Sequence, residues 1–174
     1  LPAEGHYSSA LDVAITTREL LKHPTVLNYT NIWMDTIRDG AFGLANTNKL
    51  VRFYKGANGM KTGFTSEAGY CLSGTALRDG MQLIAVVLGS PTSEDRFALA
   101  KQLLDFGFAN YRIVTPEMNL QQTLPVTHGV TDSVGLTATA PALLLEKGGG
   151  EVTQTVILPD FAEAPVAKGQ KLGT

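Results

Sequence analysis

Three short segments near the middle of the chain constrain its fold more than any other feature. Residues 61–65, 70–77 and 81–88 each have the composition of a β-strand, and turn residues separate them. The dipeptide Asp79-Gly80, between the last two segments, is typical of two-residue β-hairpin turns. The pattern therefore predicts three antiparallel strands in series. Residues 81–88 form the most apolar run in the chain, so we expect them to be the central strand.

Two helices are expected to flank this sheet. The first has Ser9 as its N-cap and Asp12 in the capping-box position, and the second begins at Ser93 and ends near Asp105. Between the first helix and the sheet, residues 26–54 are expected to form short strands joined by turns. Strands in series with flanking helices indicate an α+β fold. The buried stripes are expected to consist of Leu11, Ala14, Ile15 and Leu21 in the first helix, and of Phe97, Ala100, Leu103 and Leu104 in the second.

The composition changes after Tyr111. Residues 115–174 contain short runs of Val, Thr and Leu interrupted by Gly and Pro, and they show no amphipathic helical pattern. We predict one domain over residues 1–112 and a small all-β, sandwich-like domain over residues 113–174. The last residues have the composition of a strand that has just begun, so we expect this second domain to be truncated at its end.

The composition also excludes several classes of function. The chain has 14 Lys plus Arg against 16 Asp plus Glu without a clustered basic face, which argues against nucleic-acid binding. Its histidines are widely spaced, so we expect no metal and no cofactor. Cys71 lies in a predicted strand and is expected to be a small buried hydrophobic residue. No apolar run approaches the roughly 20 residues that span a bilayer.

The triplet Lys61-Thr62-Gly63, at the start of the predicted sheet, is the motif with chemical content. A Lys-Thr-Gly triplet is one catalytic element of serine enzymes that form acyl intermediates with penicillin, together with Ser-x-x-Lys and Ser-x-Asn motifs. Average composition produces the triplet by chance in roughly one chain of this length in twenty-five. The triplet alone therefore leaves a solvated strand lysine as the alternative interpretation of Lys61.

Further landmarks occur in a fixed order around the triplet. They are Gly-His-Tyr-Ser-Ser-Ala at 5–10, Asn-Thr-Asn-Lys-Leu at 46–50, the segment 59–65, Ala-Gly-Tyr at 68–70, and a turn followed by a helix start at 89–96. In this order and spacing the chain resembles the low-molecular-mass D-alanyl-D-alanine carboxypeptidases, which are serine-type penicillin-binding proteins of the bacterial cell wall. The resemblance covers essentially the whole chain. It implies part of a β-lactamase/transpeptidase-like domain followed by a β domain, in an extracytoplasmic location.

The resemblance also implies an activity, namely removal of the terminal D-Ala of the peptidoglycan pentapeptide through an acyl-serine intermediate. Stem peptides and β-lactams are then the expected ligands. In the family, Ser-x-x-Lys and Ser-x-Asn lie upstream of the segment that matches Leu1, and neither motif occurs in this sequence. We therefore expect the nucleophile on an upstream segment that is a partner of this chain, and we expect the chain alone to be inactive. Many family members also carry a C-terminal amphipathic helix that binds the membrane surface, and no such helix is found in this sequence.

By the same resemblance, five residues have roles in the site. Lys61 is the catalytic residue, placed beside the serines. Thr62 donates its hydroxyl to the substrate carboxylate, and Gly63 allows the substrate backbone to lie against the strand. The backbone N–H of Phe64 is one oxyanion donor. Arg96 corresponds to an arginine that faces the site and suits bidentate carboxylate binding, but an arginine in the first turn of a helix is more often a surface residue.

Other interpretations stay open at the level of sequence. The loop 46–48 borders the site in the family, and this chain has Thr47 where a relative has arginine, so no carboxylate-binding cation is expected from this loop. A β-lactamase shares the triplet and the following helix, but it usually ends near them, so the residues after Tyr111 count against it. A non-catalytic scaffold or binding protein is the third possibility, supported by the absence of Ser-x-x-Lys.

Overall fold

The computed structural model describes residues 4–118, 120, 122–150 and 152–174. The chain divides into two compact units, residues 1–112 and residues 113–174.

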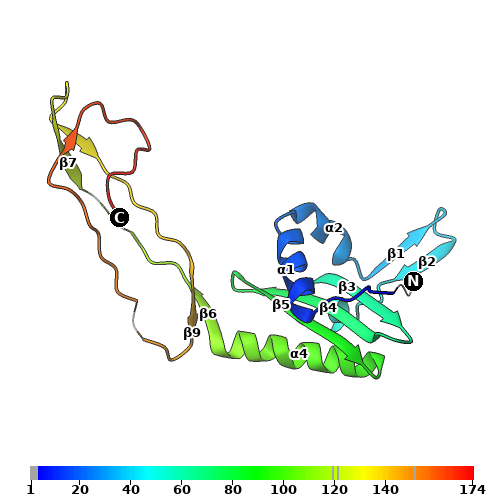
Figure 1. Cartoon of the computed structure of the whole chain (residues 1–174). Coiled ribbons are helices and arrows are strands. Elements are labelled where there is room, and N and C mark those ends of the chain that lie inside the picture. Colours follow the sequence, from blue (N-terminus) through cyan, green and yellow to red (C-terminus); the bar gives the residue numbers. More distant parts are fainter. Residues whose placement is uncertain (1–3, 119, 121, 151) are drawn as a thin grey trace. The chain divides into compact units, whose positions relative to one another are not determined.

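The first unit is built on an antiparallel sheet of three strands. They are β3 (Ala57–Thr65), β4 (Gly69–Arg78) and β5 (Met81–Ser90), in the order β3-β4-β5 (Figure 1). The turn between β4 and β5 has two residues, Asp79 and Gly80, and both have positive φ as the hairpin sequence predicts. The predicted meander is confirmed, but the prediction of its centre was wrong. β4 is central, and among the described residues β5 pairs with β4 alone. The apolar composition of β5 fits its contacts with helices on both faces of the sheet.

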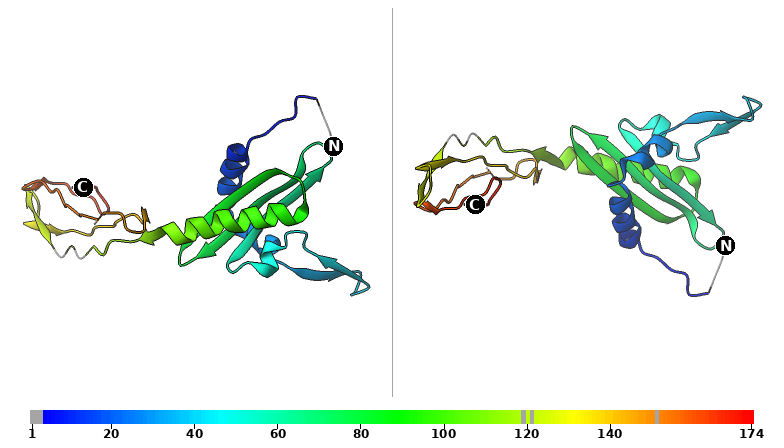
Figure 2. Two further views of the ribbon diagram at one scale, coloured as in Figure 1. Left: turned by 90° about the horizontal axis from the view of Figure 1, so that it is seen from below. Right: turned by 90° about the horizontal axis from the view of Figure 1, so that it is seen from above.

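A helix covers each face of this sheet. The helix α1 (Ala10–Leu20) lies on one face and α4 (Ser93–Asn110) on the other, as the opposite views of Figure 2 show. The core lies between β4, β5 and α4. Its members are Leu50, Leu72, Ala76, Ala85, Val87, Phe97, Ala100 and Leu104. With helices packed on an antiparallel sheet, the α+β prediction is confirmed.

Both predicted helices form, with corrections at their caps and stripes. The N-cap of α1 is Ser9, and its capping box with Asp12 is present as predicted. The N-cap of α4 is Thr92 rather than Ser93, because the Thr92 hydroxyl accepts the backbone N–H of Asp95 (3.1 Å), and the helix continues beyond Asp105. Leu103 is exposed, contrary to prediction.

Two of the four residues in the predicted buried stripe of α1 are exposed. Leu11 is 68% exposed and Ile15 is 48% exposed. The side of the helix with the lowest exposure includes Ala14 and Thr17, and Thr17 Oγ1 lies 2.8 Å from Ser73 Oγ in β4. The apolar pattern thus identified part of the covered face but also included two exposed residues, because a sequence pattern does not fix the exact side of the helix that packs on the sheet.

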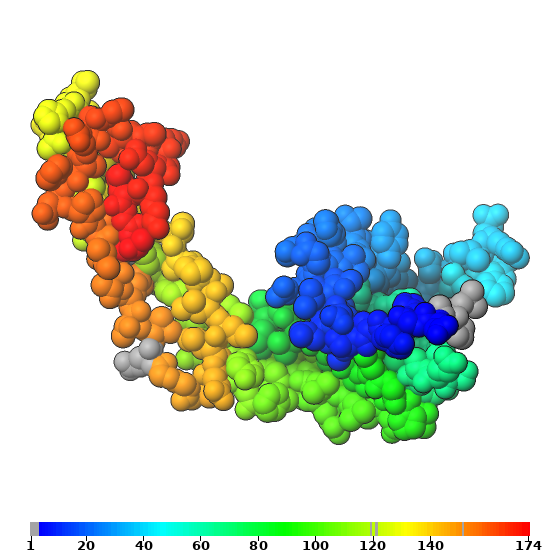
Figure 3. All heavy atoms as spheres, in the orientation of Figure 1, coloured from blue at the N-terminus to red at the C-terminus, as the bar shows by residue number. Residues whose placement is uncertain are grey.

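The segment between α1 and the sheet contains helical turns that the strand prediction missed. Two of the predicted short strands are present as a β-hairpin with a turn at Asp39-Gly40, which projects from the rest of the unit (Figure 3). The elements are η1 (Pro24–Val26), α2 (Leu27–Thr30), β1 (Met34–Ile37), β2 (Phe42–Ala45) and α3 (Leu50–Phe53).

A stacked cluster around Arg78 joins the C-cap of α3 to β4 and α4 in the first unit. The guanidinium of Arg78 lies over the rings of Tyr54 and Phe108, 4.4 Å from each ring centre. The Tyr54 hydroxyl donates to Asp105 Oδ1 (2.6 Å). Burial of this hydroxyl, helped by its bond to the carboxylate, raises the pKa of Tyr54 to about 12.

The second unit consists of short strands. Its described residues contain no helix. A three-stranded sheet has the order β10-β7-β8, with β10 parallel to β7, and β6 pairs with β9. The strands are β6 (Tyr111–Val114), β7 (Thr123–Thr127), β8 (Ser133–Gly135), β9 (Leu143–Glu146) and β10 (Ala162–Glu163). Among all the described residues of the chain, no helix is long and apolar enough to cross a bilayer.

Candidate active site

The Lys-Thr-Gly triplet lies on β3, at an edge of the sheet. Opposite Lys61, Thr62 and Gly63 on the neighbouring strand are Ser73, Leu72 and Cys71. Within the described residues, no strand pairs with the other side of β3. The backbone groups of the triplet that point away from β4 are therefore available to a ligand.

The hydrogen bonds of Arg96 indicate which backbone groups of the triplet point away from β4. Its Nη1 donates to the carbonyl oxygens of both Gly63 (3.1 Å) and Cys71 (3.2 Å). One nitrogen reaches both oxygens only if they share the space between the strands, so Gly63 and Cys71 form a hydrogen-bonded pair of the antiparallel ladder. The N–H of Phe64 belongs to the same trans peptide as the Gly63 carbonyl and points the opposite way. It therefore points to the open edge, where the predicted oxyanion donor has to be.

Lys61 is exposed, and its ammonium is held at the same edge. Its Nζ donates to the carbonyl oxygen of Thr62 at 2.5 Å. Because side chains alternate along a strand, Lys61 shares a face with its partner Ser73, which contacts Thr17 of α1. The ammonium thus adds positive charge to the edge of β3 on the face covered by α1.

Thr62 is buried, with 9% of its surface exposed, and its hydroxyl has a partner that the sequence did not predict. Thr62 Oγ1 lies 2.7 Å from Thr47 Oγ1, which belongs to the loop between β2 and α3. The sequence predicts no carboxylate-binding cation from this loop, because Thr47 carries no charge. The only indication of this contact in the sequence was the position of Thr47 in the loop 46–48, which by the resemblance borders the site.

Beside the open edge of β3, Gly63 leaves space that a side chain would fill, and Phe64 contributes an aromatic ring. A β-carbon on Gly63 would meet only Cys71 Cβ, at 3.8 Å, so packing within the described residues does not require glycine at this position. The space is consistent with close approach of a ligand backbone. The Phe64 side chain is exposed, and its ring lies against Tyr70 with 4.3 Å between the centroids.

Arg96 is buried, with 6% of its surface exposed, so its interpretation as a surface residue was wrong. Besides its two carbonyl acceptors, Nη2 contacts Ser93 Oγ at 3.4 Å, and the guanidinium lies 4.8 Å from the ring of Phe97 and 5.3 Å from that of Tyr70. Its Nε is buried without a hydrogen-bond partner. In this arrangement Arg96 connects α4 to β3 and β4 directly behind the triplet.

Cys71, predicted to be a small buried hydrophobic residue, is only half-buried. Its Sγ donates to the carbonyl oxygen of Ala68 at 3.4 Å. The described residues contain no cluster of three or more His, Cys, Asp or Glu that could hold a metal ion.

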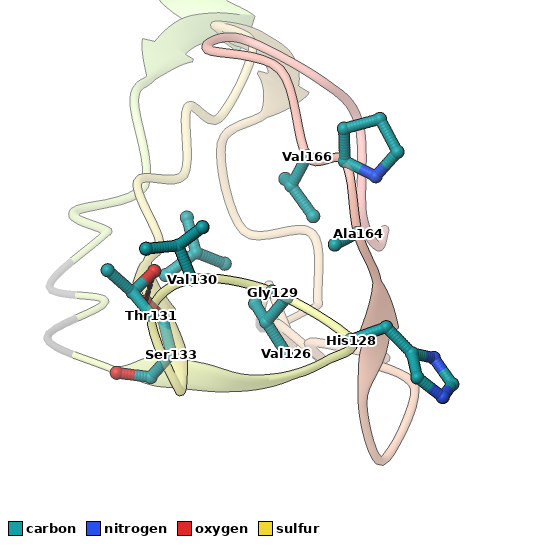
Figure 4. A pocket seen from close by; sticks show the side chains of 10 residues that line it. Val126, His128, Gly129, Val130, Thr131, Ser133, Ala164 and Val166 are labelled. Atoms are coloured by element: carbon teal, nitrogen blue, oxygen red, sulfur yellow. Dashed lines mark hydrogen bonds between the residues drawn. The ribbon is translucent and has the colours of Figure 1, made fainter.

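A hollow of about 450 Å³ lies within the second unit (Figure 4). Most of its lining is apolar, and the predicted site residues do not contribute to it. Its walls come from β7, the turn that follows it, β8, and the chain after β10, and include Val126, Val130, Val134, Ala164, Pro165 and Val166.

Comparison with known proteins gives a consistent set of relatives. A family profile described as D-alanyl-D-alanine carboxypeptidase matches residues 1–92. The D-alanyl-D-alanine carboxypeptidase DacF of Bacillus subtilis is 40% identical over 100% of this chain and 47% of its own length. DacC of Escherichia coli, of the same description, is 32% identical over 100% of this chain and 45% of its own length. The chain thus spans about half the length of the curated relatives it matches.

Solved structures agree with the sequence relatives. Penicillin-binding protein 5 of Haemophilus influenzae superposes with a TM-score of 0.73 at 33% identity, covering 99% of this chain and 52% of that protein. A penicillin-binding protein of Listeria monocytogenes in its cefotaxime-bound form gives a TM-score of 0.57 at 40% identity, covering 62% of this chain and 44% of that protein. The predicted likeness to the penicillin-binding fold is confirmed.

Proposed function

The chain belongs to the D-alanyl-D-alanine carboxypeptidase family, and from this premise we propose that it forms part of a serine-type carboxypeptidase that removes the terminal D-Ala of the peptidoglycan pentapeptide. The observation that carries the proposal is the Lys-Thr-Gly segment on the free edge of β3. The nucleophilic serine is supplied by a segment outside these 174 residues, because no serine here stands in a Ser-x-x-Lys or Ser-x-Asn motif.

In this proposal the substrate backbone extends β3 by lying along its free edge. Strand addition of this kind uses main-chain hydrogen bonds for affinity, and the open space beside Gly63 permits close approach. The hydroxyl of Thr62 donates to the terminal carboxylate. The ammonium of Lys61 attracts the same carboxylate and orders the hydrogen bonds around the serine.

The chemistry is acyl transfer in two steps. The serine oxygen attacks the carbonyl carbon of the scissile D-Ala–D-Ala bond, and the N–H of Phe64 stabilises the oxyanion that forms. The C–N bond then breaks and the leaving D-Ala nitrogen receives the proton that the serine lost. Water hydrolyses the resulting ester, which restores the serine. A β-lactam acylates the same serine by opening its ring amide, which is consistent with the cefotaxime-bound Listeria relative.

Arg96 belongs to the substrate-binding set in this proposal, but it acts through the strand. Its bonds to the carbonyls of Gly63 and Cys71 fix the peptide plane that contains the Phe64 N–H. Its charge adds to the positive potential that attracts a carboxylate, while its guanidinium stays engaged with the backbone.

The segment that bears the serine is also the proposed partner of the exposed apolar faces of the first unit. Leu11 and Ile15 form such a face on α1. Large exposed apolar patches typically mark interaction sites. The proposed location is extracytoplasmic, as the peptidoglycan substrate requires. Any attachment to the membrane surface is proposed to come from a further C-terminal helix, and no nucleic-acid partner is proposed.

Labelling with fluorescent penicillin, read on a denaturing gel, tests this function. We expect label on the polypeptide that contains the serine when it is produced together with this chain, and slow hydrolysis of penicillin compared with a D-Ala-D-Ala peptide. Fast penicillin hydrolysis would favour a β-lactamase instead. Absence of label from the complete protein would leave a non-catalytic scaffold, the reading that the missing Ser-x-x-Lys supports.

A further inference from the structure

We propose that Thr47 is a positioning residue of this site, and that its hydroxyl makes Thr62 a selective donor to a ligand carboxylate. The inference rests on the function proposed above. Its starting observation is the 2.7 Å distance between the hydroxyl oxygens of Thr47 and Thr62, which are 15 positions apart in the sequence. Thr62 is buried on β3, whereas Thr47 is exposed to solvent.

The loop that carries Thr47 is held in place on both sides. Asn46 Nδ2 donates to the carbonyls of Thr30 (3.2 Å) and Ile32 (2.8 Å), and Asn46 Oδ1 accepts the N–H of Asn48 (2.9 Å). Asn48 is 2% exposed, and its own Oδ1 accepts a backbone N–H at the start of α3 (3.2 Å). Two anchored asparagines therefore flank Thr47, so its side chain meets Thr62 from a fixed backbone and not from a free loop.

The hydrogen-bonding capacity of hydroxyls gives this contact a direction when a ligand binds. Each hydroxyl has one proton and two lone pairs, so without a ligand either threonine can be the donor. An ionised carboxylate only accepts hydrogen bonds, so it takes the proton of Thr62. Thr47 must then donate to Thr62, which gives a chain that runs from Thr47 to Thr62 to the carboxylate.

Such a chain strengthens each of its bonds, because successive hydrogen bonds polarise one another in the same direction. The gain is largest for a charged acceptor, since charge-assisted bonds are roughly twice as strong as neutral ones. Lys61 attracts a carboxylate without a strict direction, whereas the two hydroxyls require an acceptor at one position. The geometry thus assigns to Thr47 part of the selection for ligands that end in a free carboxylate.

The experiment uses the complete protein with the serine-bearing segment, and compares Thr47→Val with Thr47→Ser. Valine keeps the branched shape without the hydroxyl, while serine keeps the hydroxyl. For Thr47→Val we expect the second-order rate constant of penicillin acylation to fall by about 3- to 10-fold, the loss of one neutral hydrogen bond. For a D-Ala-D-Ala peptide the change is expected mainly in KM. Thr47→Ser is expected to stay near the wild-type value.

Two further measurements separate this role from general stabilisation. With a peptide of the same sequence that ends in a carboxamide, Thr47→Val should have a smaller effect than with the free carboxylate. In a Thr62→Val background, Thr47→Val should have no additional effect, because the hydroxyl that it orients is gone. Thr36→Val, in the exposed β1–β2 hairpin, is the matched control and should behave as wild type.

The outcomes distinguish this inference from the function on which it rests. Unchanged acylation in Thr47→Val, or an equal loss in Thr47→Ser, would overturn the role of the Thr47 hydroxyl and leave the carboxypeptidase proposal standing. Absence of acylation in the wild-type protein would overturn both. An equal loss with the carboxylate and carboxamide peptides would also overturn the inference, since it would show support of the fold without selection for charge.

Discussion

At the scale of single residues, Arg96 makes the contacts on which the conformation of the site most depends. It is a buried cation that connects a helix to two strands through their carbonyl oxygens. Hydrogen bonds to a charged group contribute more to stability than neutral ones, and a buried guanidinium is retained only where such bonds compensate its desolvation. The strand edge that carries the triplet therefore depends on a side chain that is more than thirty positions away in the sequence.

Replacement of Arg96 by methionine tests this dependence. We expect the free energy of unfolding of Arg96→Met to fall by about 2–3 kcal/mol, because two charge-assisted bonds to backbone carbonyls are lost. Arg96→Lys should recover only part of the loss, since an ammonium lacks the planar fork of the guanidinium. Urea denaturation measures both. Arg18→Met, on the exposed surface of α1, is the control, and an Arg96→Met variant no less stable than this control would contradict the role.

Tyr54 provides a pH-dependent prediction at the same scale. Its pKa is about 12 in the folded protein against 10 as the ordinary value, so the folded state holds this proton more tightly than the unfolded state. The stabilisation is complete below pH 10 and is lost as the pH rises through 12. We expect the free energy of unfolding to decrease between these pH values, and to decrease less in Tyr54→Phe. Parallel slopes for the two proteins in denaturant titrations would refute the prediction.

At the scale of elements, local sequence determined what could be predicted. The β4–β5 hairpin was predicted because Asp79 and Gly80 favour positive φ, and α1 was predicted at its start because Ser9 and Asp12 cap it through contacts three residues apart. Such signals involve residues close in the sequence, so the elements that they define can be predicted from the sequence alone. The central position of β4 was missed, because strand order depends on pairing between distant segments, which the apolar run in β5 does not report.

The same division applies to the candidate site. Residues 61–64 could be proposed from the motif because they are adjacent on one strand. The contact of Thr47 with Thr62 could not, because it depends on the path of a loop. Arg96 was assigned two opposite environments from the sequence, since its place in the first turn of α4 does not say which side of the helix meets the sheet.

Two glycines at turns allow a prediction about the elements that they join. Gly56 and Gly80 have φ of 81° and 77°, but only Gly56 is confined, since a β-carbon there would lie 2.5 Å from the carbonyl oxygen of Leu77. Gly80→Ala should therefore cost about 1–2 kcal/mol, the penalty for the left-handed conformation. Gly56→Ala should cost clearly more, because the backbone also has to move. Thermal unfolding of both variants measures the difference, and equal costs would show that the predicted clash relaxes freely.

At the scale of the whole chain, the exposed apolar surface is the main unexplained feature of the first unit. It occurs on both helices that cover the sheet and on the projecting hairpin. The exposed residues include Leu11, Ile15 and Leu20 on α1, Met34, Ile37, Phe42 and Leu44 on the hairpin, and Leu99, Leu103 and Phe106 on α4. Exposed apolar residues that lie one helical turn apart, as Leu11 and Ile15 do, are typical of a face that another segment covers, which is why we assign the α1 face to the serine-bearing segment.

This assignment predicts how the 174-residue chain behaves alone. We expect it to bind a hydrophobic dye, to self-associate, and to unfold without a sharp cooperative transition, because apolar surface that the complete protein covers stays in contact with water. Production together with the serine-bearing segment should suppress dye binding and restore one cooperative transition. The double variant Leu11→Gln, Ile15→Gln should reduce dye binding of the isolated chain and weaken its association with that segment. Leu144→Gln, an exposed leucine of the second unit, is the control and should change neither property. An isolated chain that is monomeric, binds no dye and unfolds cooperatively would show that the α1 face needs no partner, and the assignment of that face would then be wrong even if penicillin labelling of the complete protein succeeded.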